Sequence, residues 1–95
     1  MEYLEEIRRI VLDELANRPA KVFLFGSRAR RAARASSDVD VAVLPSSPLP
    51  AVVLSRIRQR LEESRVPLRV DLVDLSDADE QFRSAVLQEA IQWSA

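Results

Sequence analysis

The spacing of apolar residues along the chain predicts alternating helices and strands. Apolar residues recur every three or four positions in residues 2–17 and from about residue 50 to residue 64, as expected of helices that bury one face. A last helix is predicted to begin at residues 76–80, where Asp77 and Glu80 fit a capping box, and to carry Trp93 on its apolar face. The Ala- and Arg-rich residues 28–35 predict a further short helix.

Three runs rich in Val, Leu and Phe predict strands at residues 21–25, 39–44 and 68–75. In the first run the four residues after Lys21 are Val, Phe, Leu and Phe, which indicates burial on both faces. Because a helix separates the second strand from the third, we expect these two strands to be parallel. The sequence therefore predicts one α/β (α+β) domain over residues 1–95, with a small three-stranded mixed sheet and about four helices.

Composition narrows the chemistry that this domain can perform. The chain has 95 residues, 47% hydrophobic and 31% charged, and a net charge of −1, so no overall field attracts nucleic acid, and direct nucleic-acid binding is not expected. It contains no Cys and no His, which excludes disulfides, histidine bases and ordinary zinc sites. No apolar run reaches membrane-spanning length, so we expect a cytoplasmic protein without membrane contact.

Two acidic residues open the second predicted strand. Asp38 and Asp40 are two positions apart, so their carboxylates project to the same side, while the rest of the strand is apolar. Neighbouring carboxylates repel each other, and burying them unpaired is costly. A divalent cation removes both penalties, and Mg²⁺ commonly binds one or two carboxylates together with substrate phosphates. The pair therefore predicts a magnesium site.

The turn after the first predicted strand carries groups that suit a phosphate. Gly26 allows close approach of a ligand to the backbone, and Ser27 adds a hydroxyl. Arg28 and Arg30 follow and are candidates for neutralising phosphate charge. A phosphate-binding turn next to a magnesium site predicts binding of a nucleoside triphosphate.

The third predicted strand supplies a third candidate carboxylate. Asp71 lies near the start of its strand, as Asp40 does in its own, so parallel pairing would bring Asp38, Asp40 and Asp71 together. Asp74 is the alternative, but it lies three residues further on and faces the other side of the strand. We therefore prefer Asp71.

These motifs resemble a known family. Gly26-Ser27-Arg28-Ala29-Arg30, Ala33-Arg34 and Ser37-Asp38-Val39-Asp40 are similar to the signature of the minimal nucleotidyltransferase (MNT) proteins, within the DNA polymerase β-like nucleotidyltransferase superfamily. The family usually has Gly after the Ala-Arg pair, where this chain has Arg31. The resemblance implies a nucleotidyltransferase fold and the third acid on the strand of Asp71.

The resemblance also implies a reaction and a partner. MNT proteins pair with a HEPN-domain toxin, and as antitoxins of type VII-like systems they transfer AMP from ATP to a tyrosine of that toxin. Carried over to this chain, Asp38, Asp40 and Asp71 would be catalytic and would bind two Mg²⁺ ions, while Gly26, Ser27, Arg28 and Arg30 would bind ATP. The alternative is a catalytically degenerate MNT module that neutralises its partner by binding alone, for which Arg31 is the best support.

Overall fold

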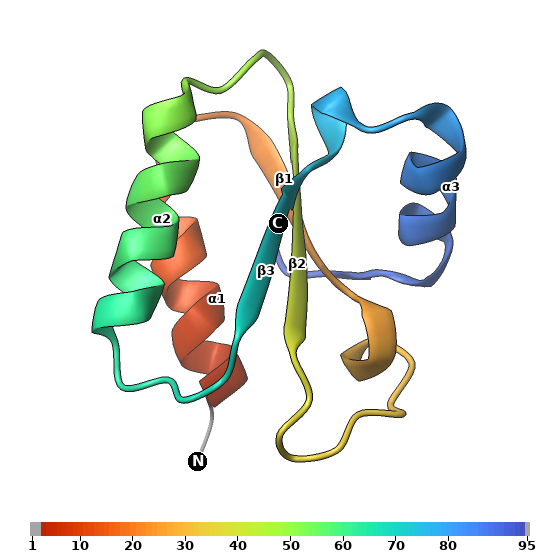
Figure 1. Cartoon of the computed structure of the whole chain (residues 1–95). Helices are drawn as coiled ribbons and strands as arrows, with labels where there is room; N and C mark the ends of the chain where they lie inside the picture. The colour runs from red at the N-terminus through yellow and green to blue at the C-terminus, as the bar shows by residue number, and fades with distance from the viewer. Residues whose placement is uncertain (1–2, 95) are drawn as a thin grey trace.

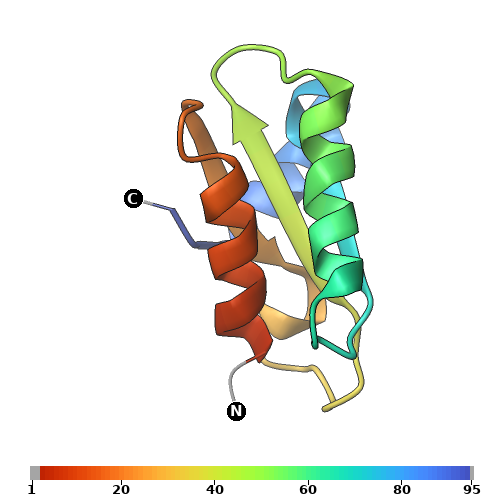
Figure 2. The same ribbon diagram turned by 90° about the vertical axis from the view of Figure 1, so that its left-hand side faces the viewer.

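The computed structural model describes residues 3–94, which form a sheet with helices on both faces. Helices α1 and α2 cover one face of the sheet and α3 covers the other (Figure 1). Seen from the side of the helix pair, α1 and α2 lie next to each other in front of the strands (Figure 2). The elements in chain order are α1 (Tyr3–Glu14), β1 (Ala20–Phe25), the 3₁₀ turn η1 (Gly26–Arg28), β2 (Val39–Pro45), α2 (Ala51–Glu63), β3 (Val70–Asp74), the 3₁₀ turn η2 (Leu75–Asp77), α3 (Glu80–Glu89) and β4 (Ile91–Gln92).

The sheet is mixed, with the strand order β3-β2-β1-β4. Strand β1 pairs with β2 and with β4 in antiparallel fashion, and β2 pairs with β3 in parallel, which confirms the predicted crossover through α2. Two register pairs matter for function: Phe25 lies opposite Asp40, and Asp40 lies opposite Asp71. The pairing thus places the end of β1 and the starts of β2 and β3 side by side.

Alternation along the strands divides the core into two clusters. Val22 and Leu24 of β1 face α1 and α2, while Phe23 faces α3, which confirms that this strand is buried on both faces. The larger cluster, below α1 and α2, also contains Val39, Val41 and Val43 of β2. The smaller cluster lies between the sheet and α3 and consists of Phe23, Ala42, Leu75 and Val86.

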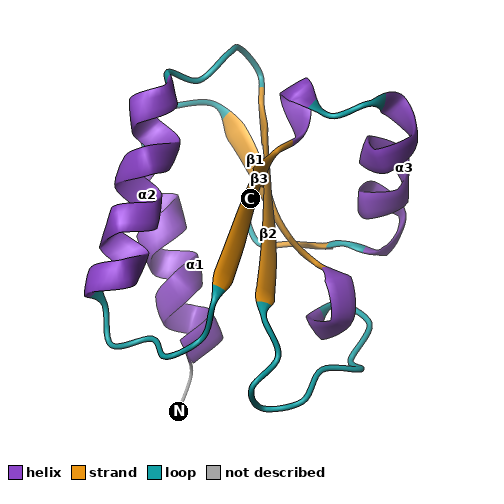
Figure 3. Cartoon of the chain, in the orientation of Figure 1, coloured by secondary structure: helices purple, strands orange, loops and turns teal. Residues whose placement is uncertain are grey.

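The fold class is as predicted, but the element counts and several boundaries are corrected. No helix forms over residues 28–35; η1 ends at Arg28 and an irregular loop continues to β2 (Figure 3). Among residues 3–94 there are three α-helices and four strands rather than about four helices and three strands. Helix α1 ends at Glu14 rather than residue 17, and its predicted start at Glu2 lies outside the described residues.

The C-terminal segment forms a fourth strand where the sequence predicts that the last helix continues. Helix α3 begins after Asp79, whose side chain accepts a hydrogen bond from the Phe82 N–H at 2.8 Å, so the N-cap is Asp79 and not Asp77. The helix ends at Glu89, and the chain then pairs with β1 as β4. Trp93 follows β4 and is not on the predicted helix, and its N–H donates to the Val22 carbonyl at 2.7 Å. Its side chain is nevertheless buried in the larger cluster, as a place on the apolar face implied.

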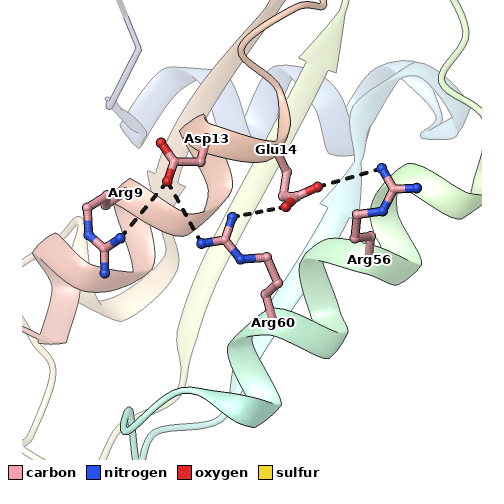
Figure 4. A network of polar contacts seen from close by, with 5 residues as sticks. All are labelled: Arg9, Asp13, Glu14, Arg56 and Arg60. Carbon is pink, nitrogen blue, oxygen red and sulfur yellow. Dashed lines mark hydrogen bonds and ion pairs between the residues drawn. The ribbon is translucent and has the colours of Figure 1, made fainter.

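An ion-pair network joins the two helices that cover the larger cluster. The Arg60 guanidinium of α2 lies between two carboxylates of α1, 2.9 Å from Glu14 and 3.8 Å from Asp13 (Figure 4). Arg56 lies 3.8 Å from Glu14 on the other side, and Arg9 reaches Asp13 at 4.0 Å. Exposed pairs contribute little each, but a network sharing partners fixes how the two helices lie against each other. No helix within residues 3–94 has the length and apolar character needed to cross a membrane.

Candidate active site

The site begins where β1 ends, at a glycine packed against a carboxylate. Gly26 has a φ of +76°, in the left-handed region that glycine adopts without strain. A Cβ at this position would overlap Oδ2 of Asp40 and lie 3.1 Å from its Cγ. Glycine is therefore favoured at position 26 both by the backbone conformation and because the Asp40 carboxylate occupies the space of a side chain.

The structure brings the three predicted acids into one neighbourhood. Asp40 and Asp71 lie opposite each other on parallel strands, and both are on the α3 face of the sheet, like Ala42 and Val73. Partial burial raises the pKa of the Asp40 carboxyl, and the negative charges of Asp71 and Asp38 raise this pKa further. These effects on the Asp40 carboxyl indicate that Asp38 and Asp71 both lie near it.

The three carboxylates do not, however, converge as a closed set of ligands. Within residues 3–94 no group of three acidic side chains is gathered tightly enough to hold a metal ion. The Asp71 carboxylate instead lies 3.3 Å from Nε of Arg69, two positions earlier on the same side of the chain. Repulsion from Asp40 and attraction to Arg69 both favour this arrangement.

Asp74, the alternative third acid, has a different part in the structure. Strand alternation places it on the face opposite Asp71, and its register partner is Val43 rather than an acid. Its carboxylate accepts hydrogen bonds from the N–H and the hydroxyl of Ser76, at 2.9 and 2.6 Å, and thereby caps η2. The geometry therefore favours Asp71 over Asp74 as the companion of Asp40.

Arg28 is held by the loop that follows it. Its Nη2 donates to the carbonyl oxygens of Ser37, Ala35 and Arg34, at 2.8, 3.2 and 3.4 Å. Its Nε is buried and has no hydrogen-bond partner among the described residues. The guanidinium thus ties η1 to the segment that leads into β2 and Asp38, while the predicted contact of Arg28 with a nucleotide stays a prediction.

Arg30 lies on the open side of the same turn. Its Nη1 is 2.9 Å from Oε1 of Glu89 at the end of α3, in an exposed pair. Its positive charge lowers the pKa of Asp40, against the larger effects of burial and the neighbouring acids. Arg30 is therefore close to the acidic cluster and connects it to α3, a connection that the sequence did not predict.

A groove of about 800 Å³ starts at the acids and runs round the free edge of β3. Asp40, Asp71 and Phe25 line it near the Gly26 turn, and Phe82 of α3 lines it further along. The opposite wall comes from α2 and the segment before β3, including Arg58 and Arg69. Sequence analysis missed Phe25, Phe82 and the two arginines, because no local pattern shows which elements meet at this groove.

The donor set fits a magnesium ion in its chemistry. Carboxylate oxygens are the ligands that Mg²⁺ prefers, and Asp40 and Asp71 present them from adjacent positions of two parallel strands. The absence of space for a side chain at Gly26 leaves the backbone of the turn directly against Asp40. Asp38, Asp40 and Asp71 therefore stay the predicted ligands of this ion, although within residues 3–94 they are not gathered into a metal site.

Comparisons with known proteins agree with this geometry. Residues 5–92 match the family model "Polymerase beta, Nucleotidyltransferase". A curated Haemophilus influenzae protein, named "Probable protein adenylyltransferase MntA", is 37% identical over 65 residues, which are 68% of this chain. Those residues span only 57% of the length of that relative.

Solved structures give the same picture. The chain matches a structure presented as a candidate minimal nucleotidyltransferase with a TM-score of 0.74 and 35% identity, over 95% of this chain and 92% of the other. It also matches a toxin–antitoxin structure with AMP-PNP, with a TM-score of 0.73 and 25% identity, over 93% of this chain and 73% of the other. A third match is an MNT antitoxin in complex with the tri-AMPylated HEPN toxin of Shewanella oneidensis, with a TM-score of 0.71 and 26% identity, over 100% of this chain and 73% of the other. From its sequence match and its fold, this chain belongs to the polymerase β nucleotidyltransferase family and resembles the MNT antitoxins within it.

Proposed function

We propose that this chain transfers AMP from ATP to a tyrosine hydroxyl of a HEPN-domain partner and acts as its antitoxin in the cytoplasm. The observation that carries the proposal is the pairing of Asp40 with Asp71 directly beside the Gly26-Ser27 turn. The MNT antitoxin structure with a tri-AMPylated HEPN toxin supports the choice of partner and modification. The AMP-PNP complex of a similar protein supports ATP as the donor.

In the proposed reaction the acceptor oxygen attacks the α-phosphorus of ATP. A new P–O bond forms, the bond from the α-phosphorus to the oxygen bridging to the β-phosphate breaks, and pyrophosphate leaves. Bound magnesium would supply positive charge at the phosphate oxygens. Asp71 accepts the hydroxyl proton, Gly26 and Ser27 hold the outer phosphates, and Arg30 offsets the charge that develops on pyrophosphate.

The competing hypothesis is a module that binds its partner without chemistry. Its main support was Arg31 at the position where the family usually has Gly. Arg31 has a φ of 59°, so it adopts the left-handed conformation that a glycine would adopt there. An arginine is therefore compatible with a left-handed turn at this position, and Arg31 by itself gives the binding-only hypothesis no structural support.

The test is a transfer assay with the purified chain, its HEPN partner, MgCl₂ and ATP labelled at the α-phosphate. We expect label on the partner, release of pyrophosphate, and loss of both with Asp38→Ala or when MgCl₂ is omitted. Asp74→Ala is the matched control, since Asp74 caps η2 on the other face of the sheet, and it should retain transfer. Equal labelling by the wild type and Asp38→Ala, or no labelling by either, would reject the proposal.

A further inference from the structure

An exposed aromatic ring faces the groove beside the acids. Phe82, on the first turn of α3, is 42% exposed, although large apolar side chains are usually buried. It lines the same groove as Asp40 and Asp71. Leu87 on the same helix is similarly exposed, at 38%, but does not line the groove.

The neighbouring ring holds Phe82 in place and leaves it accessible. Phe25 and Phe82 pack edge to face, with ring centroids 6.4 Å apart and an angle of 86° between the planes. In such a pair, Phe25 contacts only part of the Phe82 ring, and the exposed 42% of Phe82 is available to a ligand. Phe25 directly precedes Gly26, and the aromatic pair is therefore fixed to the proposed phosphate turn.

The chemistry changes along this side of the groove. Its start is polar, with the carboxylates of Asp71 and of Asp40, against which Gly26 packs, whereas Phe25, Val73 and Phe82 make the following part of this side apolar. A nucleotide has the same division, with charged phosphates at one end and a flat, apolar-faced base at the other. The groove volume of about 800 Å³ is also in the range of small-molecule sites.

We infer that Phe82 is the platform on which the base of the nucleotide stacks, supported from behind by Phe25. The inference rests on the proposed function, which places the α-phosphate at Asp40 and Asp71. Stacking on an aromatic ring tolerates any base, so Phe82 contributes affinity and orientation rather than selection of adenine. Phe82 is thus assigned as a nucleotide-positioning residue.

The test compares two ligands, ATP and inorganic tripolyphosphate, which shares the phosphates but lacks the base. Binding of each is measured by calorimetry in MgCl₂ for the wild type, Phe82→Leu, Phe82→Tyr and the control Leu87→Ala. Leucine keeps apolar packing against Phe25 but has no ring face, whereas tyrosine keeps the ring. We expect Phe82→Leu to weaken ATP binding roughly tenfold or more, the loss of one base–aromatic stack, and to leave tripolyphosphate binding unchanged.

Phe82→Tyr and Leu87→Ala should both retain wild-type affinity for ATP. The inference is overturned if Phe82→Leu weakens both ligands equally, which would indicate a structural effect, or weakens neither. It is also overturned if this variant changes only the KM for the partner protein, since the ring would then receive the acceptor. If the wild type binds neither ligand, the proposed function itself fails, and this result is distinct from all the others.

Discussion

The contact between Gly26 and Asp40 allows a decisive test of the site. Replacing Gly26 with Ala forces a Cβ into the space of the Asp40 carboxylate and places an L-residue at a φ of +76°. The backbone strain is about 1–2 kcal/mol, partly offset by about 0.4–1 kcal/mol from the reduced freedom of the unfolded chain. A net loss near 1 kcal/mol lowers Tm by roughly 4–8 °C in a domain of this size.

The effect on activity should be much larger than the effect on stability. The carboxylate of Asp40 can rotate away from the new Cβ at little energetic cost, but it then leaves the position opposite Asp71. Misplacement of a reacting group by about 1 Å can reduce the rate roughly hundredfold. We therefore expect Gly26→Ala to fold, to melt a few degrees lower, and to lose AMP transfer roughly hundredfold.

Thermal melting and the labelled transfer assay measure the two effects on the same preparations. Ile57→Val is the matched control, because Ile57 is fully buried in the α1–α2 cluster and its truncation costs about 0.5–1.5 kcal/mol away from the site. It should lose a similar amount of stability and keep its activity. Wild-type kcat/KM in Gly26→Ala, or an equal loss in both variants, would refute the reasoning.

Three further variants test the site and the loop that leads to it. Arg31→Gly should relieve a left-handed conformation, raise stability by about 0.5–1 kcal/mol in a thermal melt, and leave transfer unchanged; a lower Tm would contradict the φ of 59°. The pKa of the Asp40 carboxyl is higher in the folded state than in the unfolded state, so the folded protein binds the carboxyl proton more tightly. The free energy of unfolding of the wild type therefore falls as pH rises through the raised pKa of Asp40. Asp40→Asn should therefore be more stable than the wild type in urea at pH 7, with the difference vanishing below the ordinary aspartate pKa of 3.8; a pH-independent difference would speak against the raised pKa of Asp40. Arg28→Ala removes the charged donor to three loop carbonyls, so it should lower the free energy of unfolding by about 1.5–3 kcal/mol and speed proteolysis within residues 29–38. Unchanged proteolysis would count against the proposed role of Arg28 in holding the loop.

The sequence alone determined the elements that contain the acids and the turn. Strand β1 and strand β2 follow from short apolar runs, because a run of Val, Leu and Phe has few stable arrangements other than burial in a sheet. The position of Gly26 at the end of one strand and of Asp38 and Asp40 at the start of the next is equally local. The parallel placement of β3 followed from the intervening helix.

Helix propensity gave the wrong prediction in two segments whose backbone conformation is set by contacts with other parts of the chain. Residues 28–35 have helical propensity, but the Arg28 guanidinium and the left-handed Arg31 hold this segment as a turn and loop. The last residues before the C-terminus continue a helical pattern, but hydrogen bonds to the open edge of β1 convert them into β4. In both segments, contacts made only in the folded chain outweigh propensities of a few tenths of a kcal/mol per residue.

Tertiary structure also decided which side chains complete the site. Strand spacing indicated that Asp71 and Asp74 point to opposite faces, but only the register opposite Asp40 and the capping of Ser76 by Asp74 distinguish their parts. The meeting of Phe82 with Phe25 and of Glu89 with Arg30 depends on where α3 packs, more than 50 residues from the turn. Spacing along a strand fixes which side chains share a face, whereas the neighbours of that face are set by packing of the whole chain.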